Sequence, residues 1–114
     1  MPHIDLDVRA LAPDTPVRIE NGAAGIVVVR TVRGVVAYED VCPHAGWRLS
    51  QGEVIDGRLE CPGHGWEFAL DSGACASVPG YCLRRIDVMP LDGGFVRIRW
   101  HEQPAAAAVA ADAM

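Results

Sequence analysis

The sequence lacks any run of basic side chains. Lys and Arg together number 10 against 15 Asp and Glu, so the 114-residue chain has a net charge of −5. Proteins that hold nucleic acid by its phosphate backbone need clustered Lys and Arg, so this composition argues against a nucleic-acid partner. Aromatic residues are also scarce, at 6%, whereas 12 Gly and 8 Pro indicate many turns and few long helices.

The chain also lacks long apolar segments and the features of a leader peptide. No stretch approaches the roughly 18 consecutive apolar residues of a membrane helix. The first residues, MPHIDLDV, contain neither a cluster of positive charge nor an apolar run, so we expect no signal peptide. We therefore expect a cytoplasmic protein with no membrane partner, in which Cys residues are ligands or free thiols rather than disulfides.

What the sequence contains instead is a succession of short strand patterns. Apolar and polar residues alternate, or β-branched residues cluster, in segments 4–8, 17–20, 25–31, 35–38, 53–55, 58–61, 66–68, 83–88 and 95–100. The dipeptides Asn21-Gly22 and Asp56-Gly57 favour tight hairpin turns between such strands. The pattern predicts one all-β domain of antiparallel strands over residues 1–103, a sandwich or small barrel. The Ala-rich stretch 104–114 has no such pattern, and we expect it to be a disordered tail.

Two similar hexapeptides interrupt these strands, CPHAGW at 42–47 and CPGHGW at 61–66. Each supplies one Cys and one His, so Cys42, His44, Cys61 and His64 are candidate metal ligands. The hairpin predicted at Asp56-Gly57 explains the 16 residues between the two motifs, because a hairpin returns the second loop to the tip where the first ends.

Two kinds of metal centre compete for these ligands. A structural zinc site uses the same N and S donors, but zinc motifs usually place roughly two to four residues between paired ligands. Only one residue separates Cys42 from His44. A mixed [2Fe–2S] cluster takes two Cys on one iron and two His on the other, and its sulfides accept hydrogen bonds from a Gly-rich backbone. Pro43 and Pro62 would stiffen both loops. Unliganded side chains are the ordinary interpretation of one such Cys or His, but not of four in paired loops.

The pair Cys42-Pro-His44 and Cys61-Pro-Gly-His64 resembles the Rieske motif, in a match that covers roughly residues 4–100. The resemblance implies a Rieske-type antiparallel β-sandwich with a small two-loop cluster-binding subdomain, about residues 41–80, at one end. It implies one [2Fe–2S] cluster, with Cys42 and Cys61 on the inner iron and His44 and His64 on the outer iron. The residues that the match places around the cluster are Pro43, Gly46, Trp47, Pro62, Gly63, Gly65, Trp66 and, in a third loop, Pro79.

The branch of the family follows from groups that this chain lacks. Rieske proteins of respiratory and photosynthetic complexes have a disulfide-forming Cys in each loop, where this chain has Trp47 and Gly63. They also have Ser and Tyr donors to the cluster sulfurs, where this chain has Trp66 and Phe68. Because such donors stabilise the reduced cluster, their absence implies a low potential, on the order of −150 mV. Trp47 is expected either as an exposed anchor for a partner or packed beneath the cluster, and Trp66 as buried.

The resemblance therefore implies a small ferredoxin that carries single electrons from a flavin-dependent NAD(P)H reductase to a terminal oxygenase of aromatic or hydrocarbon hydroxylation. We expect no catalytic residue, no room for an oxygenase catalytic domain, and a monomer. The small Rieske subunit of an assimilatory nitrite reductase is the alternative within redox proteins. A zinc-stabilised binding module without a redox role is the alternative from another class.

The remaining thiols and the acidic residues near the motif carry weaker expectations. Cys75 and Cys82 lie outside the motif, and we expect two unpaired thiols. Glu39, Asp40 and Glu53 are candidate docking charges for a partner, although a solvated face explains them equally well.

Overall fold

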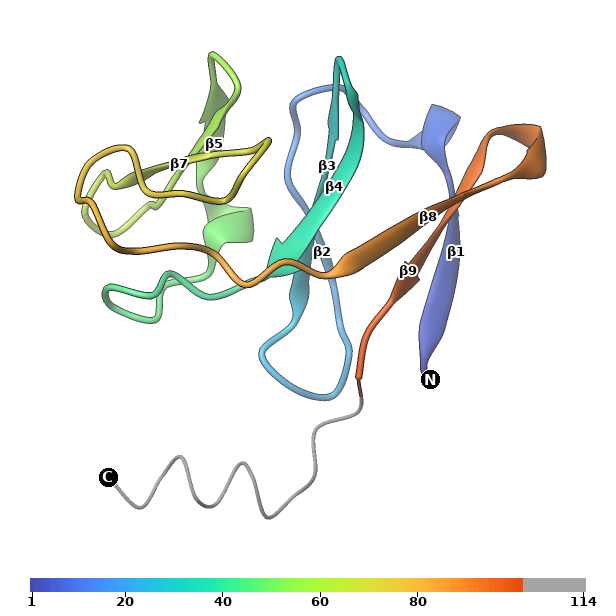
Figure 1. The fold of residues 1–114 in the computed structure, drawn as a ribbon, viewed down its shortest axis with the longest axis horizontal. Coiled ribbons are helices and arrows are strands. Elements are labelled where there is room, and N and C mark those ends of the chain that lie inside the picture. Colours follow the sequence, from blue (N-terminus) through green and yellow to red (C-terminus); the bar gives the residue numbers. More distant parts are fainter. Residues whose placement is uncertain (102–114) are drawn as a thin grey trace.

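The computed structural model describes residues 1–101 as three antiparallel sheets of three strands each, which follow one another across the molecule (Figure 1). Their strand orders are β1-β9-β8, β2-β3-β4 and β5-β6-β7. The strands are β1 (His3–Asp7), β2 (Val17–Ile19), β3 (Ile26–Thr31), β4 (Gly34–Glu39), β5 (Glu53–Ile55), β6 (Arg58–Glu60), β7 (Glu67–Ala69), β8 (Asp87–Leu91) and β9 (Phe95–Arg99). Three 3-10 helices accompany them, η1 (Val8–Ala10), η2 (Leu49–Gln51) and η3 (Asp92–Gly94). The predicted all-β fold is confirmed, whereas the predicted tail lies outside the described residues.

The middle sheet is packed on both faces, which explains the uninterrupted apolar run in β3. Val27 and Val29 belong to the core cluster shared with the β5-β6-β7 sheet, and Ile26 and Val28 to the cluster shared with the β1-β9-β8 sheet. Successive side chains of a strand point to opposite faces, so one strand supplies both cores. Each of these aliphatic side chains is at most 1% exposed, and full burial contributes about 1.5–3 kcal/mol per side chain.

The hairpin between β5 and β6 forms at the predicted dipeptide. Ile55 pairs with Arg58, and the two turn residues Asp56 and Gly57 have φ of 50° and 75°. Two successive residues with positive φ are the signature of a type I′ turn, whose twist matches that of the flanking strands. The turn reverses the chain within two residues, and the second motif loop therefore returns to the end where the first one lies.

One predicted strand is misplaced. The alternating pattern predicts a strand over residues 83–88, but β8, which pairs with β9, begins only at Asp87. Residues 84–86 instead run along the edge of β4, where the N–H of Ile86 donates to the carbonyl of Ala37 at 2.9 Å. An extended segment that crosses between two sheets alternates in the same way as a paired strand, so the pattern alone does not separate them. β8 is an edge strand, which is why it accepts Pro90 without losing a hydrogen bond.

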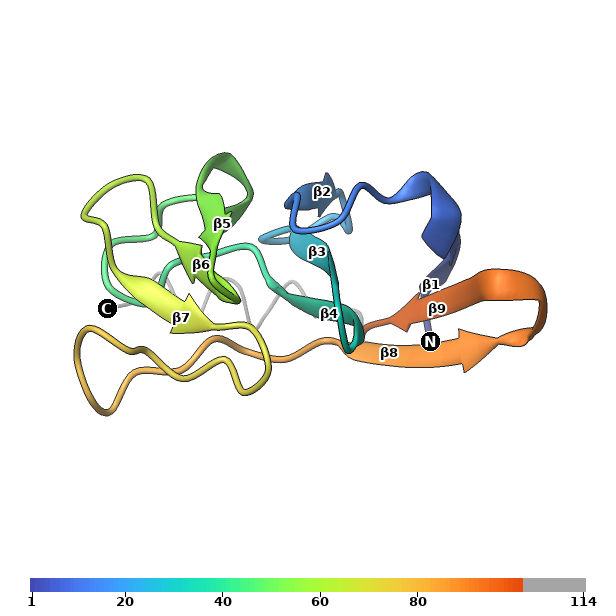
Figure 2. The same ribbon diagram turned by 90° about the horizontal axis from the view of Figure 1, so that it is seen from above.

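Three loops gather at one end of the molecule, at the left of Figures 1 and 2. Loop 1 is residues 42–47, loop 2 is residues 61–66 and loop 3 is residues 74–82. Loop 1 follows β4 and leads to η2, loop 2 joins β6 to β7, and loop 3 lies between β7 and β8. In the described part of the chain, no helix has the length and apolar character needed to cross a membrane.

Candidate metal centre

Loop 1 is a tight turn closed by two backbone hydrogen bonds. The N–H of Cys42 donates to the carbonyl of Trp47 at 2.8 Å, and the N–H of Gly46 donates to the carbonyl of Cys42 at 2.8 Å. Gly46 has a φ of 76°, in the left-handed region that residues with a Cβ rarely adopt. The first Cys of the motif is therefore held at the base of a rigid turn.

Loop 2 repeats this geometry at the corresponding positions. The N–H of Cys61 donates to the carbonyl of Trp66 at 2.7 Å, and the N–H of Gly65 donates to the carbonyl of Cys61 at 3.0 Å. Gly65 has a φ of 71°. The similarity of the two hexapeptides is thus a similarity of backbone structure, which places one Cys at the base of each turn.

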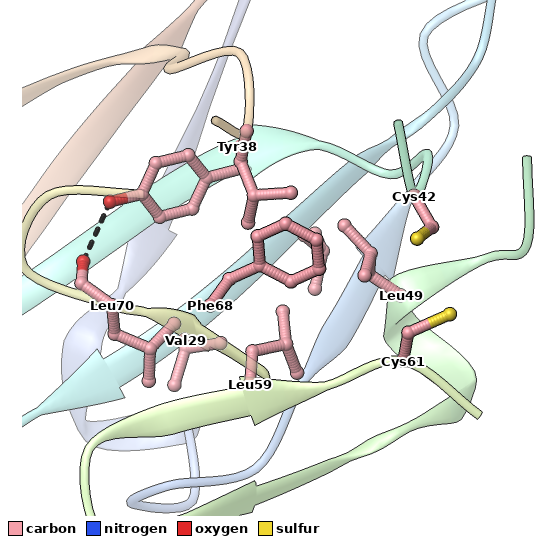
Figure 3. Packing of buried hydrophobic residues seen from close by; sticks show 10 residues of the cluster. Val29, Tyr38, Cys42, Leu49, Leu59, Cys61, Phe68 and Leu70 are labelled. Atoms are coloured by element: carbon pink, nitrogen blue, oxygen red, sulfur yellow. Dashed lines mark hydrogen bonds between the residues drawn. The ribbon is translucent and has the colours of Figure 1, made fainter. Parts of the chain in front are cut away.

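The two Cys side chains lie together at the inner side of the loops. Cys42 and Cys61 are each 1% exposed and belong to the same core cluster as Leu49 and Phe68, and Figure 3 shows both sulfurs at one edge of that cluster. Burial raises the pKa of the Cys42 thiol, and its neighbour Cys61 raises it further, whereas hydrogen bonds from the backbone N–H groups of His44 and Ala45 lower it. Backbone donors aimed at a buried sulfur suit a thiolate whose charge a metal compensates.

The two imidazoles lie together at the outer side. His44 and His64 are both exposed, with ring centroids 4.7 Å apart and planes at 77°. The ring of His44 stacks on that of Trp66 at 4.1 Å and 13°, and Tyr81 of loop 3 meets the indole edge-on at 5.0 Å. Trp66, which was predicted to be buried, is half-buried. Sequence reasoning missed Tyr81, which no motif marks.

A buried carboxylate holds the base of loop 1, and this corrects one prediction. The side chain of Asp40 is 0% exposed, so it is not a docking charge. It accepts hydrogen bonds from Arg18 Nη1 at 2.8 Å, from the Ser50 N–H at 2.7 Å and from the Ser50 hydroxyl. Hydrogen bonds to Glu20 and then to Asp40 raise the pKa of Arg18. These partners are 10 and 22 residues away in sequence, so no local pattern reveals them.

The two remaining cysteines are unpaired, as predicted. Cys82 is exposed, and Cys75 is half-buried with its sulfur accepting a hydrogen bond from the Val78 N–H at 3.3 Å. Ala74 pairs with Cys82 in an antiparallel bridge. Because neighbouring residues of an extended segment point to opposite faces, the Cys75 and Cys82 side chains diverge.

The arrangement of the four candidate ligands fits a two-iron cluster better than a single metal ion. Within residues 1–101, no three His, Cys, Asp or Glu side chains surround one point suited to a lone ion. Zinc needs all its ligands at about 2.0–2.3 Å from one centre. A mixed [2Fe–2S] cluster takes its ligands in two pairs sorted by type. Here the sulfurs form an inner pair and the imidazoles form an outer pair.

Comparison with known sequences agrees with this chemistry. The profile of the Rieske [2Fe-2S] domain matches residues 2–90. The ferredoxin component of biphenyl 2,3-dioxygenase from Rhodococcus jostii (strain RHA1) is 33% identical over 88 residues, which are 77% of this chain and 82% of that protein. The chloroplast protein TIC 55 of Arabidopsis thaliana is 42% identical over 67 residues. This chain spans only 12% of the length of that relative.

Solved structures share the fold. A chain from the complex of reduced oxygenase and oxidised ferredoxin in carbazole 1,9a-dioxygenase is 32% identical and superposes with a TM-score of 0.74. The match covers 82% of this chain and 96% of that chain. The small subunit of a nitrite reductase from Mycobacterium tuberculosis superposes with a TM-score of 0.72 over 90% of this chain and 100% of its own, but at 21% identity it shows the fold alone.

A matching profile over most of the chain, paired Cys and His in twin loops and a shared fold lead to one conclusion: the chain belongs to the Rieske [2Fe–2S] domain family and carries a cluster with two Cys and two His ligands.

Proposed function

We propose that Cys42, Cys61, His44 and His64 hold the cluster and that the protein is a one-electron carrier. When bound, the cluster takes up and releases a single electron at a time. The observation that carries the proposal is the sorting of the four side chains, with the sulfurs buried in the core and the imidazoles exposed at the tip. An electron carrier needs one side of its centre sheltered and the other within reach of a partner.

The chain itself has three tasks in this role. Cys42 and Cys61 anchor the inner side, where backbone N–H groups directed at the Cys42 sulfur stabilise negative charge. The stacked indole of Trp66 fixes the orientation of the His44 ring. Phe68, fully buried beneath loop 2, offers no hydroxyl to the site, which supports a potential in the low part of the family range.

The three loops around the imidazoles lack charged residues, although the exposed Arg48 directly follows loop 1. Residues 41–47, 61–66 and 74–83 contain no Asp, Glu, Lys or Arg, although the whole chain has 10 basic and 15 acidic residues. Two aromatic side chains of these segments are exposed, Trp47 at 47% and Tyr81 at 40%. A partner would therefore dock by shape and apolar contact, with aromatic anchors of the kind that dominate protein interfaces. Its affinity should depend only weakly on salt, because charge screening acts on charges.

The partners that fit this role are a flavin-dependent NAD(P)H reductase as electron donor and a terminal oxygenase as acceptor. The resemblance to a biphenyl dioxygenase ferredoxin component supports this pairing, as does the resemblance to a chain from an oxygenase–ferredoxin complex. The proposal includes a cytoplasmic monomer with Pro79 in the loop that covers the cluster. The free thiols Cys75 and Cys82 suit a reducing compartment.

The test begins with the purified protein. We expect about two iron and two sulfide per chain, a red-brown colour that bleaches with dithionite, and the EPR spectrum of a mixed-ligand reduced cluster. The single substitution His64→Cys should leave any cluster with a markedly lower potential. A colourless protein that contains one zinc would refute the proposal.

The second step measures electron flow. NADH and a flavoprotein reductase from an aromatic dioxygenase system should reduce the protein, and the matching terminal oxygenase should reoxidise it. Reduction and reoxidation rates that stay within about twofold between low and moderate salt would agree with an uncharged docking tip. Reoxidation only by a nitrite reductase catalytic subunit would favour the alternative redox role.

A further inference from the structure

Side chains alone connect the two motif loops. Each loop is closed by its own hydrogen bonds, and within residues 1–101 no backbone hydrogen bond joins one loop to the other. Three of the connections are the inner pair of sulfurs, the outer pair of imidazoles and the stack of His44 on Trp66. The fourth connection is the indole of Trp47, at the end of loop 1, which lies on the backbone of Gly63 in loop 2.

The indole occupies the place where a side chain at position 63 would lie. Unlike most glycines of this chain, Gly63 does not have a positive φ, so its backbone conformation would accept a Cβ. That Cβ, however, would lie 2.3 Å from Nε1 and 2.5 Å from Cδ1 of Trp47, far inside van der Waals contact. The requirement for glycine at position 63 is therefore set by the indole of the opposite loop and not by backbone strain.

Both partners of this contact are directly connected to candidate ligands. The carbonyl of Trp47 accepts the hydrogen bond from Cys42, so the residue is fixed to the first ligand. Gly63 immediately precedes His64 in the chain. A shift of the indole would therefore be transmitted over one residue to an outer ligand and over one hydrogen bond to an inner ligand.

We propose that Trp47 and Gly63 form a brace that sets the spacing of the two ligand loops, with Trp47 as a positioning residue. The brace is a property of the polypeptide, whereas its redox consequence rests on the proposed function. The indole also covers one flank of loop 2 from water. Exposure to water favours the more highly charged reduced state, so loss of this cover is expected to raise the reduction potential.

The test is a double-mutant cycle of Trp47→Ala and Gly63→Ala. In the parent chain, Gly63→Ala should displace the indole and lower the urea midpoint of the protein as purified. In the Trp47→Ala background, the same added methyl group has space and should change the midpoint no further. Both single variants should raise the reduction potential and shorten the half-time of iron release to a chelator several-fold. Trp47→Phe, whose ring is smaller, should retain part of the brace and tolerate Gly63→Ala better than the parent.

The outcomes separate the brace from the proposed function. A Gly63→Ala penalty of equal size in both backgrounds would overturn the brace, as would no penalty in either. Unchanged potentials and unchanged iron release in both single variants would also overturn the positioning role. Coupled midpoints in a purified chain that holds no iron would support the brace while refuting the electron carrier.

Discussion

Loop 1 and loop 2 have the same internal hydrogen bonds but are attached to the fold in different ways. Loop 2 joins neighbouring strands, and the pair Glu60 and Glu67 closes its base as part of the β6-β7 ladder. Loop 1 leaves β4 and enters the 3-10 helix η2 with no strand beside it. Its two ends are tied instead by the carboxylate of Asp40, which accepts two hydrogen bonds from Ser50.

The difference shows that one local turn can be supported by two kinds of interaction. A ladder of backbone hydrogen bonds does not depend on any single side chain, so loop 2 should tolerate substitution at its base. Loop 1 depends more on one side chain, because removal of the buried Asp40 carboxylate leaves the N–H and hydroxyl of Ser50 without their acceptor.

The largest expected effect would show the two loops to be equivalent. Cys42→Ser and Cys61→Ser should each abolish the cluster, since each removes one of only two thiolate ligands. The measurement is iron content per chain together with visible absorbance. Cys82→Ser is the matched control, because that thiol is exposed and outside both loops, and it should leave both signals unchanged. Full cluster occupancy in either motif variant would remove that Cys from the ligand set.

The next effect would distinguish the loops. Asp40→Ala should lower the free energy of unfolding by about 1–3 kcal/mol, because it leaves the N–H and hydroxyl of Ser50 without their acceptor, while Arg18 keeps its ion pair with Glu20. Glu67→Ala is the matched change at the base of loop 2, where the ion pair with Arg58 is exposed and contributes about 0–1 kcal/mol. Urea denaturation measures both. Equal losses would contradict the idea that the loops are anchored differently.

A smaller effect should again be the same in both loops. Gly46→Ala and Gly65→Ala should each cost about 1–2 kcal/mol, since both residues have left-handed φ, where a Cβ is strained. A Cβ at either position would meet no atom within 4 Å, so no steric clash adds to this cost. Denaturation curves of the two variants should therefore nearly coincide, and a clear separation would mean that the two turns differ.

The smallest effect concerns the end of the molecule away from the loops. Hydrogen bonding to Arg97 lowers the pKa of Asp5 from its ordinary value of 3.8, and hydrogen bonding to Arg9 lowers that of Asp7. As the pH falls, the unfolded chain therefore takes up protons at these two carboxylates before the folded protein does. The stabilisation from the two ion pairs is present above pH 3.8 and is lost as the pH falls through the lowered pKa values of the folded protein. Asp5→Asn should reduce this acid sensitivity slightly in thermal melts between pH 5 and about 2. An unchanged pH profile would show that the Asp5–Arg97 pair contributes nothing.

Sequence reasoning reached the fold class and the candidate site because both depend on local patterns. The twin hexapeptides and the Asp56-Gly57 turn are read within a few residues, and the turn formed where it was predicted. The misplaced strand over 83–88 failed for the opposite reason. Whether an extended segment pairs with β9 or crosses the edge of β4 depends on partners far away in the chain.

The sequence by itself determined the ligand types and the two turns that present them, because residue identity and short-range backbone preferences suffice for both. Only the tertiary structure decided what holds those turns in place. It buried Asp40 against Arg18 of β2, laid Trp47 on Gly63 and stacked His44 on Trp66. These contacts join residues from separate segments, and their partners are fixed by how the sheets and loops pack rather than by any spacing along the chain.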